Sequence, residues 1–268
     1  MFPRIIIKQK HLRLILKPRF FAVRLIFRSA EYLFQLMKNI NRRQKLKGTL
    51  AEDIDLAYTS SLELIEIVKL ANVKIIYDIG AHTGTWSFLA KALIPESIIH
   101  AFEPIKLHIT EFQNRMSHIK DINLHQVALG NQNGDMSIKI TNRSDSSSLL
   151  DSTELADEQY GVKKDREQMI KIFTLDDYII TQKIPLPDFI KLDVQGYELE
   201  VLKGSQQCIK YAKWILCEVS FYSYYQNQPL FYDICEHLKK YQYNIYAFGS
   251  DTPTGSILTQ VDVLFKRN

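Results

Sequence analysis

The sequence predicts an α/β fold: a mostly parallel sheet with helices on both faces and an antiparallel last strand, preceded by a basic helical arm. From residue 60 onward, strand-like and helix-like segments alternate, which is typical of a parallel sheet with crossover helices. The last two strand-like segments, 243–250 and 261–267, have no helix between them, so we expect them to pair antiparallel. A length of 268 residues suits one such domain with an appendage.

Charge divides the chain near residue 48. Residues 1–48 hold thirteen Lys or Arg side chains and one acid, Glu31, so this segment carries a formal charge of +12. Residues 49–268 carry −8, although the net charge of the whole chain is only +4. We therefore expect a basic arm over 1–48 and an acidic α/β domain over 49–268, and such an asymmetry suggests a polyanionic partner for the arm.

Apolar residues of the arm recur at helical spacing from Phe20 to Ile40, and Arg24, Arg28 and Lys38 occupy other faces. Its apolar runs are far shorter than the roughly 18 residues that span a bilayer. Such a helix suits an anionic membrane surface, with its apolar face in the acyl boundary and its cations on head groups. Packing against the domain or a second copy is an alternative. Nucleic acid is the least favoured partner, because no RNA-binding module is recognisable.

The domain's elements follow in a regular order. Ser60 and Glu63 have capping-box spacing before a helix that ends near residue 70. The next predicted segments are strand 74–79, helix 84–93, strand 97–103, helix 106–118 and strand 122–129. After the turn 130–134, alternating residues 135–141 indicate a short strand antiparallel to the preceding one, and we expect the polar segment 142–168 to form a long surface loop. Strand 169–175, helix 174–179, strand 187–194, helix 197–212, strand 214–220 and helix 228–241 precede the final pair.

The three cysteines, Cys208, Cys217 and Cys235, are odd in number and lack CxxC spacing. They fit a reducing compartment and argue against a disulfide framework or a zinc site. Arginines also interrupt the arm where a secretory signal needs an apolar stretch. The sequence therefore indicates a cytoplasmic location, with the arm at the inner face of a membrane.

The stretch "IIYDIGAHTGTWSFLA", residues 75–90, joins a buried strand to a helix through a polar turn. Gly80 permits a tight turn, Gly84 lets the helix start against the strand, and Asp78 is placed to anchor a polar ligand group. The G-x-x-x-G spacing lacks the middle glycine that a dinucleotide's pyrophosphate needs. Glu103 ends the next strand, about twenty residues on, where a carboxylate accepts hydrogen bonds from ribose hydroxyls.

Together these features indicate a nucleoside site without a diphosphate, which describes S-adenosylmethionine. The cofactor-binding residues that we expect are Asp78, Gly80, Ala81, His82, Thr83, Gly84, Glu103, Pro104 and Ala128.

Six segments resemble the FkbM family of methyltransferases in order and spacing: 75–93, 99–116, 123–138, 146–150, 173–179 and 188–204. The resemblance runs from about residue 62 to 219. The sequence departs from the family pattern at His82 and Gln195, where Asn and Glu are usual. The resemblance implies a Rossmann-like class I methyltransferase fold with a seven-stranded sheet. It also implies S-adenosylmethionine as cofactor and O-methylation of a sugar, a glycan or a lipid-linked acceptor.

The same resemblance implies an acceptor site beside the strand that ends in "KLDVQG". Asp193 would orient or deprotonate the acceptor hydroxyl, and Lys191 would act as a base if burial lowers its pKa. Glu218 would line the acceptor side, and Ser147 and Ser148 would close over it. No ligand cluster is evident in the sequence, so we expect no metal, although Asp193 would be the natural ligand.

Three other functions remain open at this level. An acid at the end of the second strand also suits an NAD-dependent oxidoreductase. The basic arm would serve a nucleic-acid methyltransferase as an electrostatic footprint. A non-catalytic binding module with a vestigial site is the third alternative.

Overall fold

The computed structural model describes residues 18–254 and 257–268, and the chain divides into two compact units with the boundary between Lys47 and Gly48. The expectations for residues 1–17 of the arm lie outside the described residues. In the first unit, the helix expected between residues 20 and 40 forms α2 (Pro18–Leu46). Within the described ranges, no helix combines the length and the apolar character that crossing a bilayer requires.

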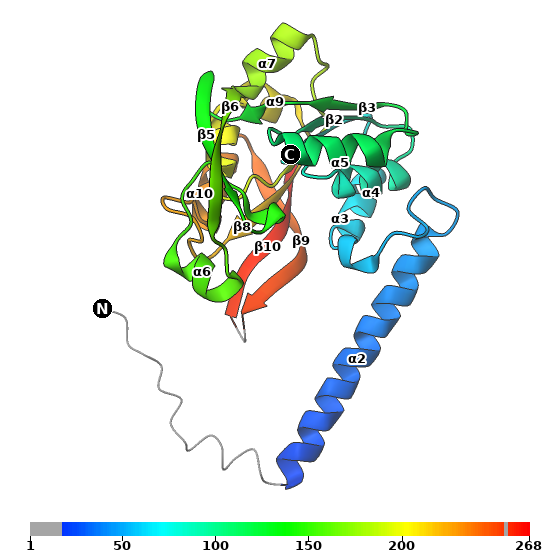
Figure 1. Cartoon of the computed structure of the whole chain (residues 1–268). Helices are drawn as coiled ribbons and strands as arrows, with labels where there is room; N and C mark the ends of the chain where they lie inside the picture. Colours follow the sequence, from blue (N-terminus) through cyan, green and yellow to red (C-terminus); the bar gives the residue numbers. More distant parts are fainter. Residues whose placement is uncertain (1–17, 255–256) are drawn as a thin grey trace. The chain divides into compact units, whose positions relative to one another are not determined.

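The second unit is built on a seven-stranded sheet with the order β3-β2-β1-β7-β8-β10-β9. Figure 1 labels its outer strands β3 and β9 and their neighbours β2 and β10. The strands are β1 (Ile75–Ile79), β2 (Ile98–Phe102), β3 (Ile122–His125), β7 (Phe189–Leu192), β8 (Trp214–Ser220), β9 (Tyr243–Thr254) and β10 (Ile257–Arg267). β3, β2, β1, β7 and β8 run parallel, whereas β10 lies antiparallel between β8 and β9. The prediction of a mostly parallel sheet with an antiparallel last strand is confirmed.

Helices cover both faces of this sheet, as predicted, because successive side chains of a strand point to opposite faces. On β2, Phe102 belongs to the large apolar core with α7 to α10, whereas Ala101 packs with Phe112 and Met116 of α5. The helices are α3 (Leu62–Lys69), α4 (Thr85–Leu93), α5 (Lys106–Met116), α7 (Leu175–Gln182), α8 (Glu198–Lys203), α9 (Gln206–Tyr211) and α10 (Phe231–Lys239).

A row of charged side chains crosses four adjacent strands on the face that α3 and α4 cover. Asp78 and Lys191 are cross-strand partners on β1 and β7, and Glu218 and Asp262 are partners on β8 and β10. Ser87 of α4 donates a hydrogen bond to Asp78, and the N-cap serine of α3 donates one to Asp262. The alternation of the strands thus sends acids and a lysine to one face while their neighbours fill the apolar core.

The segment 142–168 is structured, so the prediction of a long surface loop is wrong. It holds a 3₁₀ turn at Ser144–Ser146, α6 (Glu154–Tyr160) and the start of β6 (Lys164–Phe173). β6 pairs antiparallel with β5 (Gly134–Thr141) and parallel with β4 (Ala128–Leu129) in a second sheet, so β5 does not pair with β3 as expected. Tyr224 and Tyr225, far away in the sequence, supply the apolar surface on which α6 packs.

Two helix boundaries also differ from the prediction. The single helix expected over 197–212 breaks into α8 and α9 at Gly204, where an added Cβ would lie 1.9 Å from Gly130 O. This close backbone crossing requires glycine and interrupts the helix. The predicted N-cap at Ser60 is wrong by one residue, because α3 begins at Leu62 after Ser61.

Candidate active site

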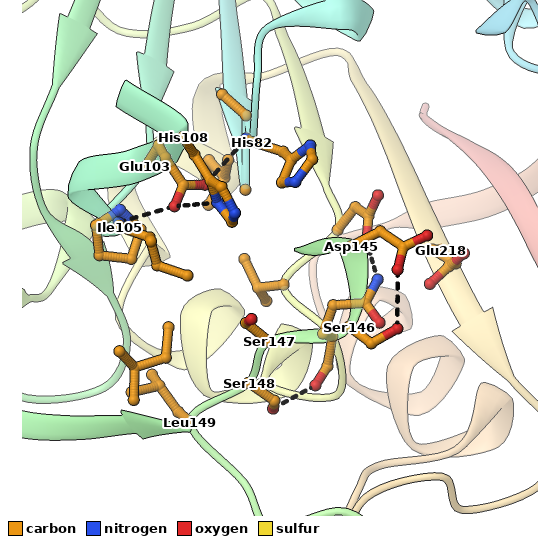
Figure 2. A pocket seen from close by; sticks show the side chains of 18 of the residues that line it. His82, Glu103, Ile105, His108, Asp145, Ser146, Ser147, Ser148, Leu149 and Glu218 are labelled. Atoms are coloured by element: carbon orange, nitrogen blue, oxygen red, sulfur yellow. Dashed lines mark hydrogen bonds and ion pairs between the residues drawn. The ribbon is translucent and has the colours of Figure 1, made fainter. Parts of the chain in front are cut away.

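A pocket of about 510 Å³ opens at the carboxyl ends of β1, β2, β7 and β8, where ligands of such sheets bind. All the predicted site residues line it except Asp78, Thr83 and Gly84. Figure 2 shows Glu103, His82 and His108 around one part of the opening, with Asp145 and Glu218 around another. The pocket therefore joins the expected cofactor residues to the expected acceptor residues in one space.

The two glycines of the β1–α4 turn have left-handed backbones, with φ of +78° at Gly80 and +81° at Gly84. A Cβ on Gly80 would lie 1.8 Å from the backbone oxygen of Asp193, so glycine lets the turn touch the end of β7. Gly84 is the N-cap of α4, and a Cβ there would lie 2.6 Å from the ring of Phe112. Gly84 therefore packs α4 against α5 and does not face the pocket.

Asp78, which the sequence suggests as an anchor for a ligand group directly or through water, is fully buried and does not line the pocket. Its carboxylate accepts a hydrogen bond from Ser87 at 2.6 Å and lies 3.1 Å from Lys191 Nζ. The ammonium of Lys191 also donates to Gly80 O at 2.8 Å. Asp78 thus acts on the pocket indirectly, because it holds the lysine that ties the glycine turn to β7.

Lys191 lines the pocket but is unsuited to the role of base. Burial by itself lowers the pKa of an ammonium, but the carboxylates of Asp78 and Asp193 outweigh it and raise the pKa of Lys191 above its ordinary value. The lysine therefore stays protonated. The expected lowering of its pKa is wrong because the sequence pattern did not reveal its partner on β1.

Glu103 follows β2 and is held in place by the backbone. Its Oε2 accepts from His82 N at 2.9 Å, and its Oε1 accepts from Ile105 N at 2.8 Å. His108 Nδ1 lies 3.2 Å from the same Oε1. A carboxylate has about four acceptor positions, so roughly one remains for a ligand hydroxyl, and a second opens only if His108 turns away.

The part of the pocket where the sequence analysis expects the acceptor contains Asp193, which is 34% exposed at the end of β7. Its Oδ1 accepts from Gln195 Nε2 at 2.9 Å, and its Oδ2 lies 3.6 Å from Lys191 Nζ. Burial, followed by the carboxylates of Asp193 and Asp262, raises the pKa of Glu218 well above its usual range. Asp193 is thus a partly exposed carboxylate in the pocket, held by the ammonium of Lys191 and the amide of Gln195.

Ser147 and Ser148 belong to the segment that borders this side of the pocket. The Ser148 hydroxyl donates to Gln195 O at 2.6 Å and accepts from Leu150 N at 3.0 Å. Ser147 Oγ accepts from Thr141 N at 3.3 Å. Both hydroxyls hold the segment in place and also line the pocket.

Comparison with known proteins decides the family. A family model described as the methyltransferase FkbM domain matches residues 78–245, which is more than half of the chain. The chain belongs to the FkbM methyltransferase family. The predicted resemblance is confirmed, and with the strand order it shows that the second unit contains a class I methyltransferase fold that uses S-adenosylmethionine.

Curated relatives of this FkbM domain are distant. It is 24% identical over 148 residues to hexuronic acid methyltransferase AglP of Haloferax volcanii, which covers 54% of this chain and 55% of the relative. It is 26% identical over 180 residues to 2-O-methyltransferase NoeI of Sinorhizobium fredii, which covers 63% of this chain and 74% of the relative. Methyltransferase 1 of Beauveria bassiana is 23% identical over 142 residues, 48% of this chain and 57% of the relative. The chain thus spans a little over half the length of two of these three relatives.

Solved structures similar to the FkbM domain include other methyltransferases at low identity. Magnesium protoporphyrin IX methyltransferase from Synechocystis PCC 6803 superposes with a TM-score of 0.46 at 12% identity, over 82% of this chain and 85% of that one. Precorrin-6y C5,15-methyltransferase from Geobacter metallireducens GS-15 gives 0.43 at 13% identity, over 77% and 88%.

The residues present in the pocket fit S-adenosylmethionine. The volume lies within the range of small-molecule sites. Glu103 offers an acceptor for a ribose hydroxyl, and Val127, Ala128 and Leu129 offer an apolar wall for a base. His82 Nε2 is buried and has no hydrogen-bond partner in the described part of the chain, so a polar ligand atom would satisfy it.

Several pocket residues escaped the sequence analysis. The ring of His108 lies edge-on to that of His82, with centroids 4.1 Å apart. The only sequence signal for this residue is its position shortly after Glu103. Tyr224 and Tyr225 lie in the run "FYSYYQ" that follows β8, near the strand end where ligands of such sheets bind. Arg143 and Asp145 also line the pocket, but they lie in the segment 142–168, which the sequence predicted as a surface loop, and no function was predicted for these two residues. In the described ranges, no group of three His, Cys, Asp or Glu side chains is arranged to hold a metal ion.

Proposed function

We propose that this chain methylates a hydroxyl group of a sugar, a glycan or a lipid-linked sugar. The observation that carries the proposal is the environment of Asp193. Its carboxylate is one-third exposed in the same pocket as Glu103, while Lys191 and Gln195 hold it from the protein side. S-adenosylmethionine supplies an electrophilic methyl group when it is bound.

In this proposal Asp193 orients the acceptor hydroxyl and accepts its proton. A positioned carboxylate of this kind contributes about 10²- to 10⁴-fold to the rate. Lys191 remains an ammonium, and its Nζ lies 3.6 Å from Asp193 Oδ2. Much of the remaining rate comes from holding the acceptor in line.

The names of two relatives support a sugar as acceptor. One relative methylates a hexuronic acid and another is a 2-O-methyltransferase, according to their names. The pocket agrees with this class, because hydroxyl and amide groups of Ser146, Tyr225, Gln195 and Gln260 border its acceptor side. Such groups recognise neutral hydroxyls by hydrogen bonding.

The test is methyl transfer from radiolabelled S-adenosylmethionine to a panel of sugar nucleotides, uronic acids and extracted glycans, with mass spectrometry of the products. We expect transfer to an acceptor of this class, and a loss of about 100-fold in Asp193→Asn with unchanged affinity for S-adenosylhomocysteine. Full activity of Asp193→Asn would exclude the proposed role. Labelled RNA as the sole product would favour a nucleic-acid methyltransferase.

Calorimetry separates the remaining alternatives. We expect binding of S-adenosylhomocysteine and none of NAD, because the turn lacks the middle glycine that a pyrophosphate needs. Binding of NAD alone would favour an oxidoreductase. Binding of S-adenosylhomocysteine without any detectable transfer would favour a non-catalytic binding module.

We further propose that α2 lies on an anionic membrane surface at the inner face of a membrane. Its large apolar side chains are 51% to 67% exposed at Ile26, Phe27, Leu33, Phe34, Met37 and Ile40. Four of these, Ile26, Leu33, Met37 and Ile40, recur at helical spacing on one face, while Arg28 and Lys38 fall on another. The buried free cysteines Cys208 and Cys217 are consistent with a reducing compartment.

Vesicle co-sedimentation of the full chain tests this surface. Replacing Leu33 and Met37 with Glu should abolish binding to phosphatidylserine vesicles, because it removes apolar burial and adds repulsion from anionic lipid. The control is Tyr232→Glu, a change of an exposed aromatic residue on α10 of the other unit. Equal sedimentation of the three proteins would contradict the proposal.

A further inference from the structure

We propose that Gln195 is a positioning residue, whose amide fixes Asp193 and joins it to the segment 146–148 at the pocket. This inference rests on the proposed role of Asp193 in the transfer. Its starting point is the backbone: Gln195 has φ of +56°, a left-handed conformation that non-glycine residues seldom adopt. Such conformations persist where surrounding contacts over-determine them, often at functional sites.

The contacts of the Gln195 amide determine which way it points. Nε2 lies 2.9 Å from Asp193 Oδ1, and a carboxylate oxygen only accepts, so the amide must present its nitrogen there. Oε1 then faces the phenol of Tyr225 at 2.9 Å, which must donate. Burial, followed by the carboxylates of Glu218, Glu198 and Asp193, raises the pKa of Tyr225, so the phenol keeps its proton.

Gln195 and its partner Tyr225 both contact the segment 146–148. Ser148 Oγ donates to the backbone oxygen of Gln195 at 2.6 Å, and Tyr225 OH also lies 3.1 Å from Ser146 O. The ring of Tyr225 rests on Gly196, where an added Cβ would lie 3.0 Å from it. The side-chain amide of Gln195 thus donates to Asp193 and accepts from Tyr225, while the backbone oxygen of the same residue accepts from Ser148.

A glutamate at position 195 would replace the hydrogen bond to Asp193 with repulsion between two carboxylates. Its carboxylate cannot donate to Asp193, and two adjacent negative charges disfavour each other's ionised form. We therefore expect Gln195→Glu to lower kcat by about 10- to 100-fold, as small misplacements near reacting groups do. We also expect the acid limb of its kcat/KM profile to move up by about one pH unit.

Gln195→Leu removes both hydrogen bonds without adding charge. It should lower kcat by a similar factor, leave the pH profile in place and leave affinity for S-adenosylhomocysteine unchanged. Tyr225→Phe should have a smaller effect, and the double variant should be no worse than Gln195→Leu, because the two residues act through one chain of contacts. The matched control is Gln206→Glu, the same chemical change at an exposed position of α9.

A second readout does not depend on methyl transfer. The side-chain ¹⁵N–¹H resonances of Gln195, assigned by their loss in Gln195→Leu, should move as pH is varied and stop moving in Asp193→Asn. Resonances that do not titrate, or that titrate equally in Asp193→Asn, would overturn the proposal, as would wild-type kcat in both Gln195 variants. If the wild-type chain methylates no sugar while these resonances titrate as expected, the proposed acceptor fails and the positioning role stands.

Discussion

The carboxylate of Asp78 and the ammonium of Lys191 lie 3.1 Å apart on neighbouring strands, with side-chain exposures of 0% and 8%. The register pairs the two residues directly across β1 and β7. Lys191 also donates a hydrogen bond to Gly80 O, so one buried ion pair fixes the glycine turn that borders the pocket. Both charges are almost entirely withdrawn from solvent, so the pair affects the stability of the fold as well as the geometry of the pocket.

Removing the lysine should therefore be costly. Lys191→Met leaves the carboxylate of Asp78 buried without its cation, which typically costs about 3–5 kcal/mol of unfolding free energy. The double variant Asp78→Asn/Lys191→Met should be more stable than Lys191→Met alone, because no charge is left unpaired. Urea denaturation measures both. Lys203→Met, which breaks the exposed pair with Glu200, should cost no more than about 1 kcal/mol, and an equal cost for both lysines would contradict this account.

Asp262 gives the fold a defined pH dependence. Burial, followed by the nearby Asp193, raises the pKa of Asp262 from 3.8 to about 6. Between these values the folded chain holds a proton that the unfolded chain has lost, so the unfolding free energy falls as pH rises from about 4 to 6. Above pH 6 this loss is complete and amounts to at most about 3 kcal/mol.

Asp262→Asn abolishes this titration. Its unfolding free energy relative to the wild type should rise between pH 4 and 6 and then stay level, as measured by urea titrations at each pH. Asp53→Asn, at an exposed position, serves as the control and should run parallel to the wild type. A constant difference between Asp262→Asn and the wild type across pH 4 to 8 would show that Asp262 does not titrate in this window.

The row of charged side chains across β1, β7, β8 and β10 could not be predicted from the sequence. The alternation of strand-like and helix-like segments predicted strands at β1, β7, β8 and β10 and a mostly parallel sheet with an antiparallel last strand. The cross-strand neighbours did not follow, because pairing partners such as Lys191 and Asp78 are more than a hundred residues apart. The pKa of Lys191 depends on those neighbours, so the sequence alone could not show that nearby carboxylates raise it.

The prediction of a loop over 142–168 was wrong for a related reason. The segment itself holds too few apolar residues to predict α6. The apolar surface against which α6 packs comes from Tyr224 and Tyr225. Local composition therefore indicated a loop where tertiary contacts form structure. By contrast, the turn 80–84 was predicted well, since the left-handed φ of Gly80 and Gly84 is a local requirement that glycine satisfies.

Alanine at Gly80 tests the close approach at that turn. The added Cβ would overlap the backbone oxygen of Asp193, so we expect a loss of more than about 3 kcal/mol or a displaced β7 end that no longer binds S-adenosylhomocysteine. Gly161→Ala is the matched control, with φ of +63° and no atom within 4 Å of the new Cβ. It should cost only about 1–2 kcal/mol from backbone strain. Equal losses would show that strain alone explains both.

We expect Glu103 and His108 to contribute separately to cofactor affinity. Glu103→Gln keeps the size of the side chain but replaces a charged acceptor, so binding of S-adenosylhomocysteine should weaken by about 10- to 100-fold. His108→Ala releases one acceptor position on Glu103 Oε1, so affinity should change by less than about 3-fold. Calorimetry at one pH compares the two. A larger loss in His108→Ala than in Glu103→Gln would mean that the histidine, and not the carboxylate, makes the main polar contact with the nucleoside.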